Sequence, residues 1–229
     1  MDRTRFSLHT ELVMMKVDAL KIYAVVTADQ RNSRRAEDRV PVALEALAAV
    51  DRDRLALPFE RTVGDEIQAL TGDPGVVVDV VLALTRLTDW HIGIGLGPVD
   101  QPLPRSTREA RGTAYLAART AVDEARAAPS NLRLAAAETV SAGPYGETAV
   151  RRAEAALVML RALVARRTEQ GWEVIDMLDA TGSGQGAAQR LGVSPSAVSQ
   201  RAARAARAES RLGAALARSL LAEAMGVTS

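Results

Sequence analysis

The amino-acid sequence predicts an α+β fold in which a region of mixed strands and helices precedes an all-helical region. Three observations support this expectation. Between residues 22 and 137, short apolar runs alternate with helical patterns in the order βαββαβαβ. A cluster of chain-breaking residues follows at 143–146, and after it the apolar spacing is helical throughout. The chain has 229 residues, 48% of them hydrophobic, which is enough for a sizeable core.

Each element of the first region has a local signal in the sequence. The β-branched run at 22–27 predicts a buried strand, and the helical spacing at 35–54 predicts a helix with Pro41 near its first turn. Gly64 suits the turn of a hairpin, and the alternate glycines after His91 leave room for close backbone approach. The remaining elements are a hairpin at 58–70, helices at 73–87 and 106–127, and strands at 91–97 and 131–137.

Residues 147–169 form a long predicted helix with a single apolar stripe. Such a stripe either packs against a partner helix or docks on the first region, and the sequence favours neither. The stripe residues are Ala149, Ala153, Ala156, Leu160 and Leu163.

A two-helix motif with a glycine turn occupies residues 185–201. Ala188 is small enough for a close helix crossing, and Gly192 suits the left-handed turn between the helices. Ser194 is a natural N-cap and Pro195 a natural first residue of the second helix. The pattern resembles a helix-turn-helix, whose second helix contacts bases and phosphates of double-stranded DNA. The candidate DNA-binding residues are Ser194, Ser196, Ser199, Gln200, Arg201, Arg204 and Arg207.

Basic charge gathers in the same C-terminal region. The chain has 29 basic and 28 acidic residues in total, but residues 151–229 hold 11 arginines and 7 acidic residues. Between residues 190 and 218, six arginines face a single acid, Glu209, which favours a local anion-binding surface. The alternative is an ordinary helical hairpin with a solvated arginine-rich face. The stretch 197–201 is similar to MarR-type winged helices and to region 4 of sigma factors, but residues 202–225 have the pattern of a continued helix and not of a wing.

Four pieces of the first region, in the right order, are similar to the catalytic core of class III nucleotidyl cyclases. Asp29 follows the first strand, and residues 61–65 stand where those enzymes have Lys-Thr-x-Gly-Asp. Residues 92–98 are similar to their Val-Gly-Ile-His-x-Gly strand, and residues 115–119 to their Asn-x-Ala-Ala-Arg helix. The resemblance implies a ferredoxin-like palm domain, related to the GGDEF fold.

The cyclase resemblance also implies roles for individual residues. Asp29 and Asp65 would hold Mg²⁺, the candidate cofactor, against the phosphates of a nucleotide. Arg119 would stabilise charge on the transferring phosphoryl group if the domain is catalytic. The candidate ligand-binding residues are Arg61, Arg111, Ser33 and Tyr115.

Each of these residues also has a purely structural interpretation. Asp29 is able to cap the following turn, and Asp65 is able to serve in a hairpin turn alone. Arg119 is spaced to pair with Asp123 at i, i+4. Two departures from the cyclase pattern, Arg61 for lysine and Tyr115 for asparagine, leave the substrate open. We therefore expect ligand binding in preference to turnover.

At the level of the whole chain, a Gly-Asp-Glu-Ile-Gln palm, an Ala-Arg-Gly helix and a C-terminal Ala-Val-Ser-Gln-Arg motif are similar to the SatD family of bacterial proteins, often labelled transcriptional regulators. This resemblance implies an architecture and not a mechanism. From the two motifs together we expect a sequence-specific DNA-binding transcriptional regulator whose N-terminal domain senses a nucleotide or another phosphate ligand. We expect a homodimer, because paired helix-turn-helix units read half-sites one helical turn apart and cyclase sites form between two palms. The alternative is a Mg²⁺-dependent cyclase with a DNA-binding tail. The expected divisions are an N-terminal extension at 1–20, a palm-like ligand-binding domain at 21–142, a connecting or dimerisation helix at 147–170 and a helix-turn-helix domain at 171–229.

Composition excludes several other kinds of function. With no cysteine there is no disulfide, thiolate metal site or cysteine nucleophile, and two histidines offer little to a metal. Seven aromatic residues are too few for a platform that stacks single-stranded bases. No stretch approaches the roughly 20 apolar residues of a membrane span, so we expect a cytoplasmic protein without a membrane partner.

Overall fold

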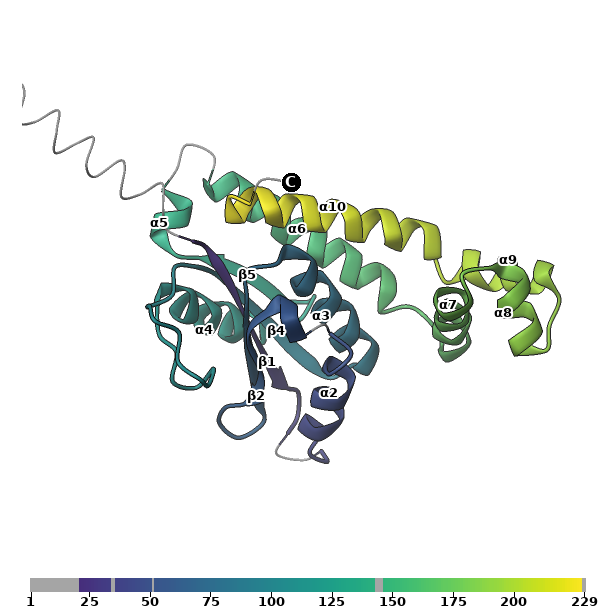
Figure 1. The fold of residues 1–229 in the computed structure, drawn as a ribbon, viewed down its shortest axis with the longest axis horizontal. Helices are drawn as coiled ribbons and strands as arrows, with labels where there is room; N and C mark the ends of the chain where they lie inside the picture. The colour runs from purple at the N-terminus through teal and green to yellow at the C-terminus, as the bar shows by residue number, and fades with distance from the viewer. Residues whose placement is uncertain (1–20, 34–35, 51, 143–145, 228–229) are drawn as a thin grey trace, which may run out of the picture.

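The computed structural model describes residues 21–33, 36–50, 52–142 and 146–227. It has a mixed α+β fold with a five-stranded mixed sheet (Figure 1). The order of elements from the first to the last strand is βαββαβαβ, which confirms the order predicted from the sequence. The expected N-terminal extension at 1–20 and most of the breaker cluster lie outside the described residues.

The sheet has the strand order β2-β3-β1-β4-β5. Its central strand, β1, is antiparallel to both neighbours, and β5 is parallel to β4. Side chains of successive residues point to opposite faces, so each strand contributes to two separate layers. The strands are β1 (Tyr23–Gln30), β2 (Leu55–Arg61), β3 (Glu66–Thr71), β4 (Trp90–Gly97) and β5 (Leu132–Ala136).

Four helices pack with one face of the sheet around the larger core. Among them, α3 begins at Pro74 because the Asp73 side chain accepts a hydrogen bond from Gly75 N at 2.7 Å. The core joins Val26, Ile94 and Leu132 of the sheet to apolar residues of the helices. The four helices are α2 (Val40–Leu47), α3 (Pro74–Leu87), α6 (Gly146–Val164) and α10 (Arg207–Met225), and the short elements η1 (Arg52–Arg54) and α5 (Glu138–Ser141) connect strands and helices at the margins.

The other face of the sheet is covered in part by α4 (Thr113–Ala125), which lies directly on β4. A Cβ placed on Gly95 would be 2.1 Å from the Ala118 amide nitrogen and 2.2 Å from the Ala114 carbonyl oxygen. A Cβ on Gly93 would be 2.3 Å from the Val122 nitrogen. Alternate glycines on the strand and small residues on the helix therefore bring two backbones into contact.

Two predicted helices are shorter in the structure. The helix expected at 35–54 forms at Val40–Leu47 with Pro41 in its first turn, followed by the separate turn η1. The helix expected from residue 106 begins at Thr113, because residues 98–112 form a loop whose Val99 and Ala110 pack into a second apolar cluster with β1.

The last helix does not continue from the one before it, so the prediction of an unbroken helix over 202–225 was wrong. The chain leaves helical geometry at Ala206, whose φ is 50°. The physical reason is that the two halves belong to different cores. Val198 and Ala205 pack among the C-terminal helices, whereas Leu221 packs in the core of the sheet domain. The helix α10 therefore returns to α6 and α3 (Figure 1).

The apolar stripe of α6 is covered within the chain. Ala153 is fully buried and Leu160 is 2% exposed, both in the core shared with the sheet and α10. The structure shows both alternatives that the sequence left open, because α6 packs against helix α10 of the same chain and also docks on α3 and β5 of the first region.

Three further helices form a small unit at the far end of the molecule (Figure 1). Their own apolar cluster includes Val174, Ala188 and Val198. We call this the three-helix unit; its members are α7 (Glu169–Thr181), α8 (Gly184–Leu191) and α9 (Pro195–Arg204).

The contact between α4 and β4 predicts a large effect of one methyl group. Gly95→Ala should lower the free energy of unfolding by about 3 kcal/mol or more, because the added Cβ meets backbone atoms that cannot turn away. Gly184→Ala, where a Cβ meets nothing within 4 Å, is the matched control and should change stability by less than about 1 kcal/mol. Urea unfolding of both variants measures this, and equal stabilities would contradict the prediction.

Candidate functional site

A polar pocket of about 500 Å³ lies at the end of β1. Asp29 is the second-last residue of β1, and Asp65 belongs to the turn between β2 and β3. The β1–β3 pairing brings them together, since Gln30 N donates to the Asp65 carbonyl oxygen at 3.3 Å. Both acids and Ser33 line the pocket, so the structure places three of the predicted site residues around one cavity.

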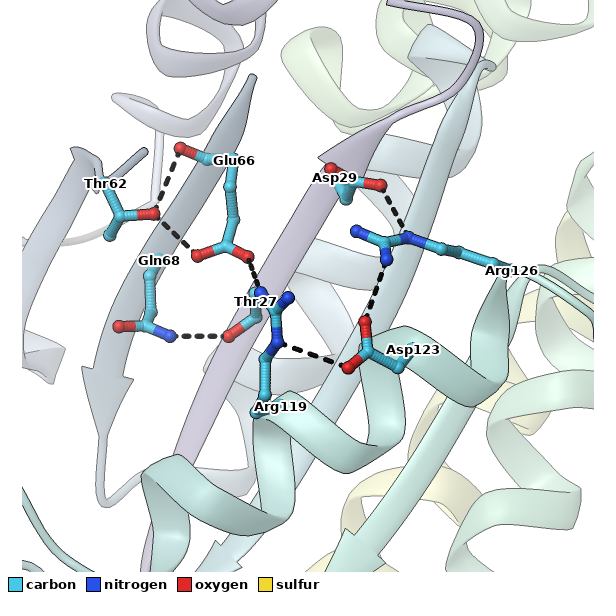
Figure 2. Close-up of polar contacts among 8 residues, drawn as sticks. All are labelled: Thr27, Asp29, Thr62, Glu66, Gln68, Arg119, Asp123 and Arg126. Atoms are coloured by element: carbon cyan, nitrogen blue, oxygen red, sulfur yellow. Dashed lines mark hydrogen bonds and ion pairs between the residues drawn. The ribbon is translucent and has the colours of Figure 1, made fainter. Parts of the chain in front are cut away.

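An arginine that the sequence analysis did not select lies closest to Asp29. Arg126 Nε donates to Asp29 Oδ2 at 3.0 Å, and Arg126 Nη1 lies 2.8 Å from Asp123 Oδ1 (Figure 2). The hydrogen bond to Asp29 is the largest cause that raises the pKa of Arg126. The Asp29 side chain is 13% exposed, so this ion pair is partly shielded from water.

The predicted transition-state arginine points to a different carboxylate. Arg119 lies 3.2 Å from Glu66 Oε2 and 3.2 Å from Asp123 Oδ2, and it is not among the residues that line the Asp29 pocket. The pairing with Asp123 is the structural interpretation that the spacing allowed. Asp123 bridges Arg119 on α4 and Arg126 at the C-cap of this helix, so the arginines at i and i+7 form one row. This spacing is the sequence signal that could have found Arg126.

The same face of the sheet carries a second set of polar contacts (Figure 2). Thr62 Oγ1 donates to Glu66 Oε1 at 2.6 Å, and Gln68 Nε2 donates to Thr27 Oγ1 at 2.7 Å. These residues lie on β1, on β3 and at the end of β2. The end of this face near Asp29 is therefore polar, whereas Tyr23, Val25 and Leu70, farther along β1 and β3, belong to the second apolar cluster.

The other predicted ligand-binding residues do not line the Asp29 pocket. Arg61 pairs with Asp38 at 2.7 Å, and Arg111 lies on the exposed loop before α4. Tyr115 packs against the second apolar cluster, and its buried hydroxyl has no hydrogen-bond partner among the described residues. Burial, and secondarily the charge of Glu60, raises the pKa of Tyr115.

The pocket offers carboxylate oxygens, which are the donors that Mg²⁺ prefers. Within the described part of the chain, no group of three or more histidine, aspartate or glutamate side chains is arranged to hold a metal. Asp29 and Asp65 supply two carboxylates to the pocket, so phosphate oxygens and water would have to complete the coordination of an ion held there. An ion on Asp29 Oδ2 would displace Arg126 from that oxygen.

A second candidate surface lies on the three-helix unit. Gly192 turns the chain between α8 and α9 with φ of 64°, and Ser194 Oγ accepts a hydrogen bond from Ala197 N at 3.1 Å. Val198 is 1% exposed and fixes the inner face of α9. On the outside of the turn and of α9, the exposed residues include Ser194, Ser196, Ser199, Gln200 and Arg204.

Two arginines of the predicted anion-binding surface have partners elsewhere in the chain. Arg207 lies 2.6 Å from Asp179, and Arg218 lies 2.7 Å from Asp79. The excess positive charge on this surface is therefore smaller than the charges of residues 190–218 predict, because Asp79 and Asp179 lie outside that range. Among the described residues, the other four arginines make no ion pair; they are Arg190, Arg201, Arg204 and Arg211.

The histidine of the Asp29 pocket predicts a pH dependence of stability. Burial, and then the charge of Arg31, lowers the pKa of His91 below 6.5 in the folded protein. As the pH falls below 6.5, the unfolded chain binds the proton more readily, so stability decreases. His91→Gln should lose less stability than the parent between about pH 7 and about pH 5 in chemical unfolding. Parallel pH profiles would contradict this prediction.

Neither a comparison with protein-family models nor one with curated protein sequences finds a match to this chain. None of the described helices combines the length and the apolar character needed to cross a membrane. The two surfaces described above are therefore the features of this chain that bear on its function.

Proposed function

We propose that this chain is a sequence-specific DNA-binding transcriptional regulator whose N-terminal domain senses a nucleotide or another phosphate-bearing ligand. One observation carries the proposal: a short helix, α9, is held by its apolar side and exposes a row of polar side chains. Ser199 and Gln200 are adjacent on that row, and Arg204 lies one turn after Gln200. Glutamine, serine and arginine are suited to reading base edges in the major groove.

The support of α9 matches what a helix-turn-helix requires. Ala188 is 3% exposed at the contact between helices, and Gly192 takes the left-handed conformation of the turn. The hydrogen bond from Ala197 N to Ser194 Oγ caps the start of α9, and Ser196 in its first turn is exposed to solvent. On this proposal α9 is the recognition helix, and a homodimer would place two such helices on half-sites one helical turn apart.

The order of the strands supports the palm-like interpretation of the N-terminal domain. The segment β1-α2-β2-β3-α3-β4 forms an antiparallel sheet in the order β2-β3-β1-β4, as a ferredoxin-like palm does. Asp29 near the end of β1 and Asp65 in the turn before β3 line one pocket, as the cyclase resemblance implies. The ligand we propose is anionic, because the pocket also contains Arg31, Asn32 and Ser33 as donors.

The same pocket contacts an element that reaches the three-helix unit. Arg31 N donates to the Asp89 carbonyl oxygen at 2.7 Å, just beyond the end of α3. In the last turn of α3, Arg86 makes two hydrogen bonds of 2.9 and 2.7 Å to Asp176 on α7. A ligand that moves residues 30–33 would therefore act on the helix that holds the three-helix unit, and we propose this route for the signal.

A second candidate function is a Mg²⁺-dependent cyclase-type activity, favoured by the shared pocket of Asp29 and Asp65. When bound, the ion would neutralise the phosphates of a nucleoside triphosphate. The two carboxylates would hold the ion, and Arg126, released from Asp29, would be free to donate to a phosphate oxygen. Arg119 would need to leave Glu66 to take the role that the resemblance implies.

The DNA-binding proposal predicts a specific effect of one amide side chain. Gln200→Ala should reduce discrimination between the preferred duplex and a scrambled one by about 1–3 kcal/mol, because an amide that pairs with a base edge is lost. The preferred duplex is selected by the parent protein from a random library, and fluorescence anisotropy measures both affinities. Gln189→Ala, an exposed glutamine on α8, is the matched control and should keep the discrimination. Unchanged discrimination in Gln200→Ala would count against α9 as the reading helix.

The sensing proposal predicts that a substitution in the Asp29 pocket removes ligand binding without changing DNA binding. Asp65→Asn should leave DNA affinity in the absence of ligand unchanged, and should abolish the thermal shift caused by nucleoside triphosphates with Mg²⁺. Chromatography of the same mixtures decides between the candidates. A cyclic nucleotide made by the parent protein and not by Asp65→Asn would favour the enzyme, whereas a shift without any product would favour the sensor.

A further inference from the structure

A second cavity, of about 260 Å³, lies where the three-helix unit joins the sheet domain. Two connections cross there: residues 165–168 between α6 and α7, and residues 205–206 between α9 and α10. We call this cavity the arginine cavity, because the side chains of four arginines line it. They are Arg166, Arg167, Arg201 and Arg204.

One of these arginines holds the two connections together. Arg167 Nε donates to the Ala205 carbonyl oxygen at 2.7 Å, and its Nη2 donates to Ser210 Oγ. Its guanidinium also lies over the Trp172 ring, 4.7 Å from the centroid. Because its Nε and Nη2 are held by the connection and by α10, Arg167 forms a fixed wall of the cavity.

The other three arginines are available to a ligand. Among the described residues, Arg166, Arg201 and Arg204 make no ion pair and no side-chain hydrogen bond. The acid closest in sequence is the exposed Glu169, so positive charge dominates the lining. Three unpaired guanidinium groups around a small hollow form a site for an anion with several acceptor oxygens, and a phosphate group is the common example.

The size and the position of the cavity favour a phosphate of the DNA backbone over a free nucleotide as its ligand. Its volume is about half that of the Asp29 pocket, which suits a single phosphate group better than a whole nucleotide. Arg204 belongs both to the exposed row of α9 and to the cavity lining. A duplex lying against Gln200 would therefore bring its backbone to the cavity.

We infer that the arginine cavity binds one backbone phosphate of duplex DNA, with Arg166 of the α6–α7 connection as a positioning contact outside the helix-turn-helix. This inference rests on the proposed DNA-binding function and adds a contact that the recognition helix does not supply. Because the cavity touches both connections, the bound phosphate would also fix the orientation of the three-helix unit relative to the sheet domain.

The test measures how the affinity for duplex DNA depends on salt. Each phosphate contact contributes about 0.9 to the slope of log affinity against log salt, which corresponds to roughly eightfold in affinity at about 0.1 M salt. With a fluorescent mixed-sequence duplex of about three helical turns, Arg166→Ala should lower the slope by about one and weaken binding roughly eightfold. Arg166→Lys should keep most of the slope, because it keeps the charge.

The control removes the same charge at a distance from the cavity. Arg151→Ala, on α6 and paired with Glu147, should leave the slope unchanged. If the parent protein binds the duplex and the Arg166→Ala slope equals that of Arg151→Ala, the phosphate contact is refuted and the DNA-binding function stands. If the parent binds no duplex, both fail. An Arg166-dependent thermal shift with inorganic phosphate, without an effect on DNA binding, would assign the cavity to a free anion and overturn the inference.

Discussion

The contact of the α4 backbone with the β4 backbone determines where the polar groups of this protein can meet. Gly93 and Gly95 have no side chains to separate the layers, so α4 approaches until Ala114 and Ala118 lie on the strand itself. The neighbouring row of the helix then reaches β1 and β3, which brings Arg126 to Asp29 and Arg119 to Glu66. With larger residues on β4 the helix would be lifted from the sheet, and the arginines would lose Asp29 and Glu66 as partners. The site is therefore a consequence of packing as much as of charge.

A comparable constraint governs the attachment of the three-helix unit. The unit joins the sheet domain through two chain connections, and Arg167 ties one to the other by donating to Ala205. A separate contact, Arg86 with Asp176, links the unit to α3. After the three-helix unit the chain returns to the sheet domain through α10, whose Leu221 is buried in the core there. DNA bound to the three-helix unit and a ligand bound to the sheet domain would thus act on connected parts of the protein, as regulation by a ligand requires.

The sequence predicted those elements whose signals are local. Asp73 before Pro74 and Ser194 before Pro195 each predicted a helix start that the structure has, because capping depends on neighbouring residues. The break at Ala206 was not predictable in this way, since alanine favours a helix and the two halves are separated by different cores. The partners of Arg207 and Arg218 lie 28 and 139 residues away, so a local charge count missed them. Asp29 and Asp65 were found through a resemblance, and Arg126 was missed because its role depends on how α4 sits on the sheet.

The pairing of Asp29 with Arg126 limits how a phosphate ligand enters the pocket. While the ion pair is closed, the guanidinium neutralises the carboxylate, and a lone phosphate must compete for Arg126 with an acid already 3.0 Å from it. If a phosphate arrived with a divalent cation, Asp29 would be a ligand for the cation, and Arg126 would be free to donate to the phosphate oxygens. Both groups of the ion pair would then have a new partner of opposite charge. For this reason a cation dependence of ligand binding would not by itself distinguish a sensor from an enzyme, whereas the formation of a product would.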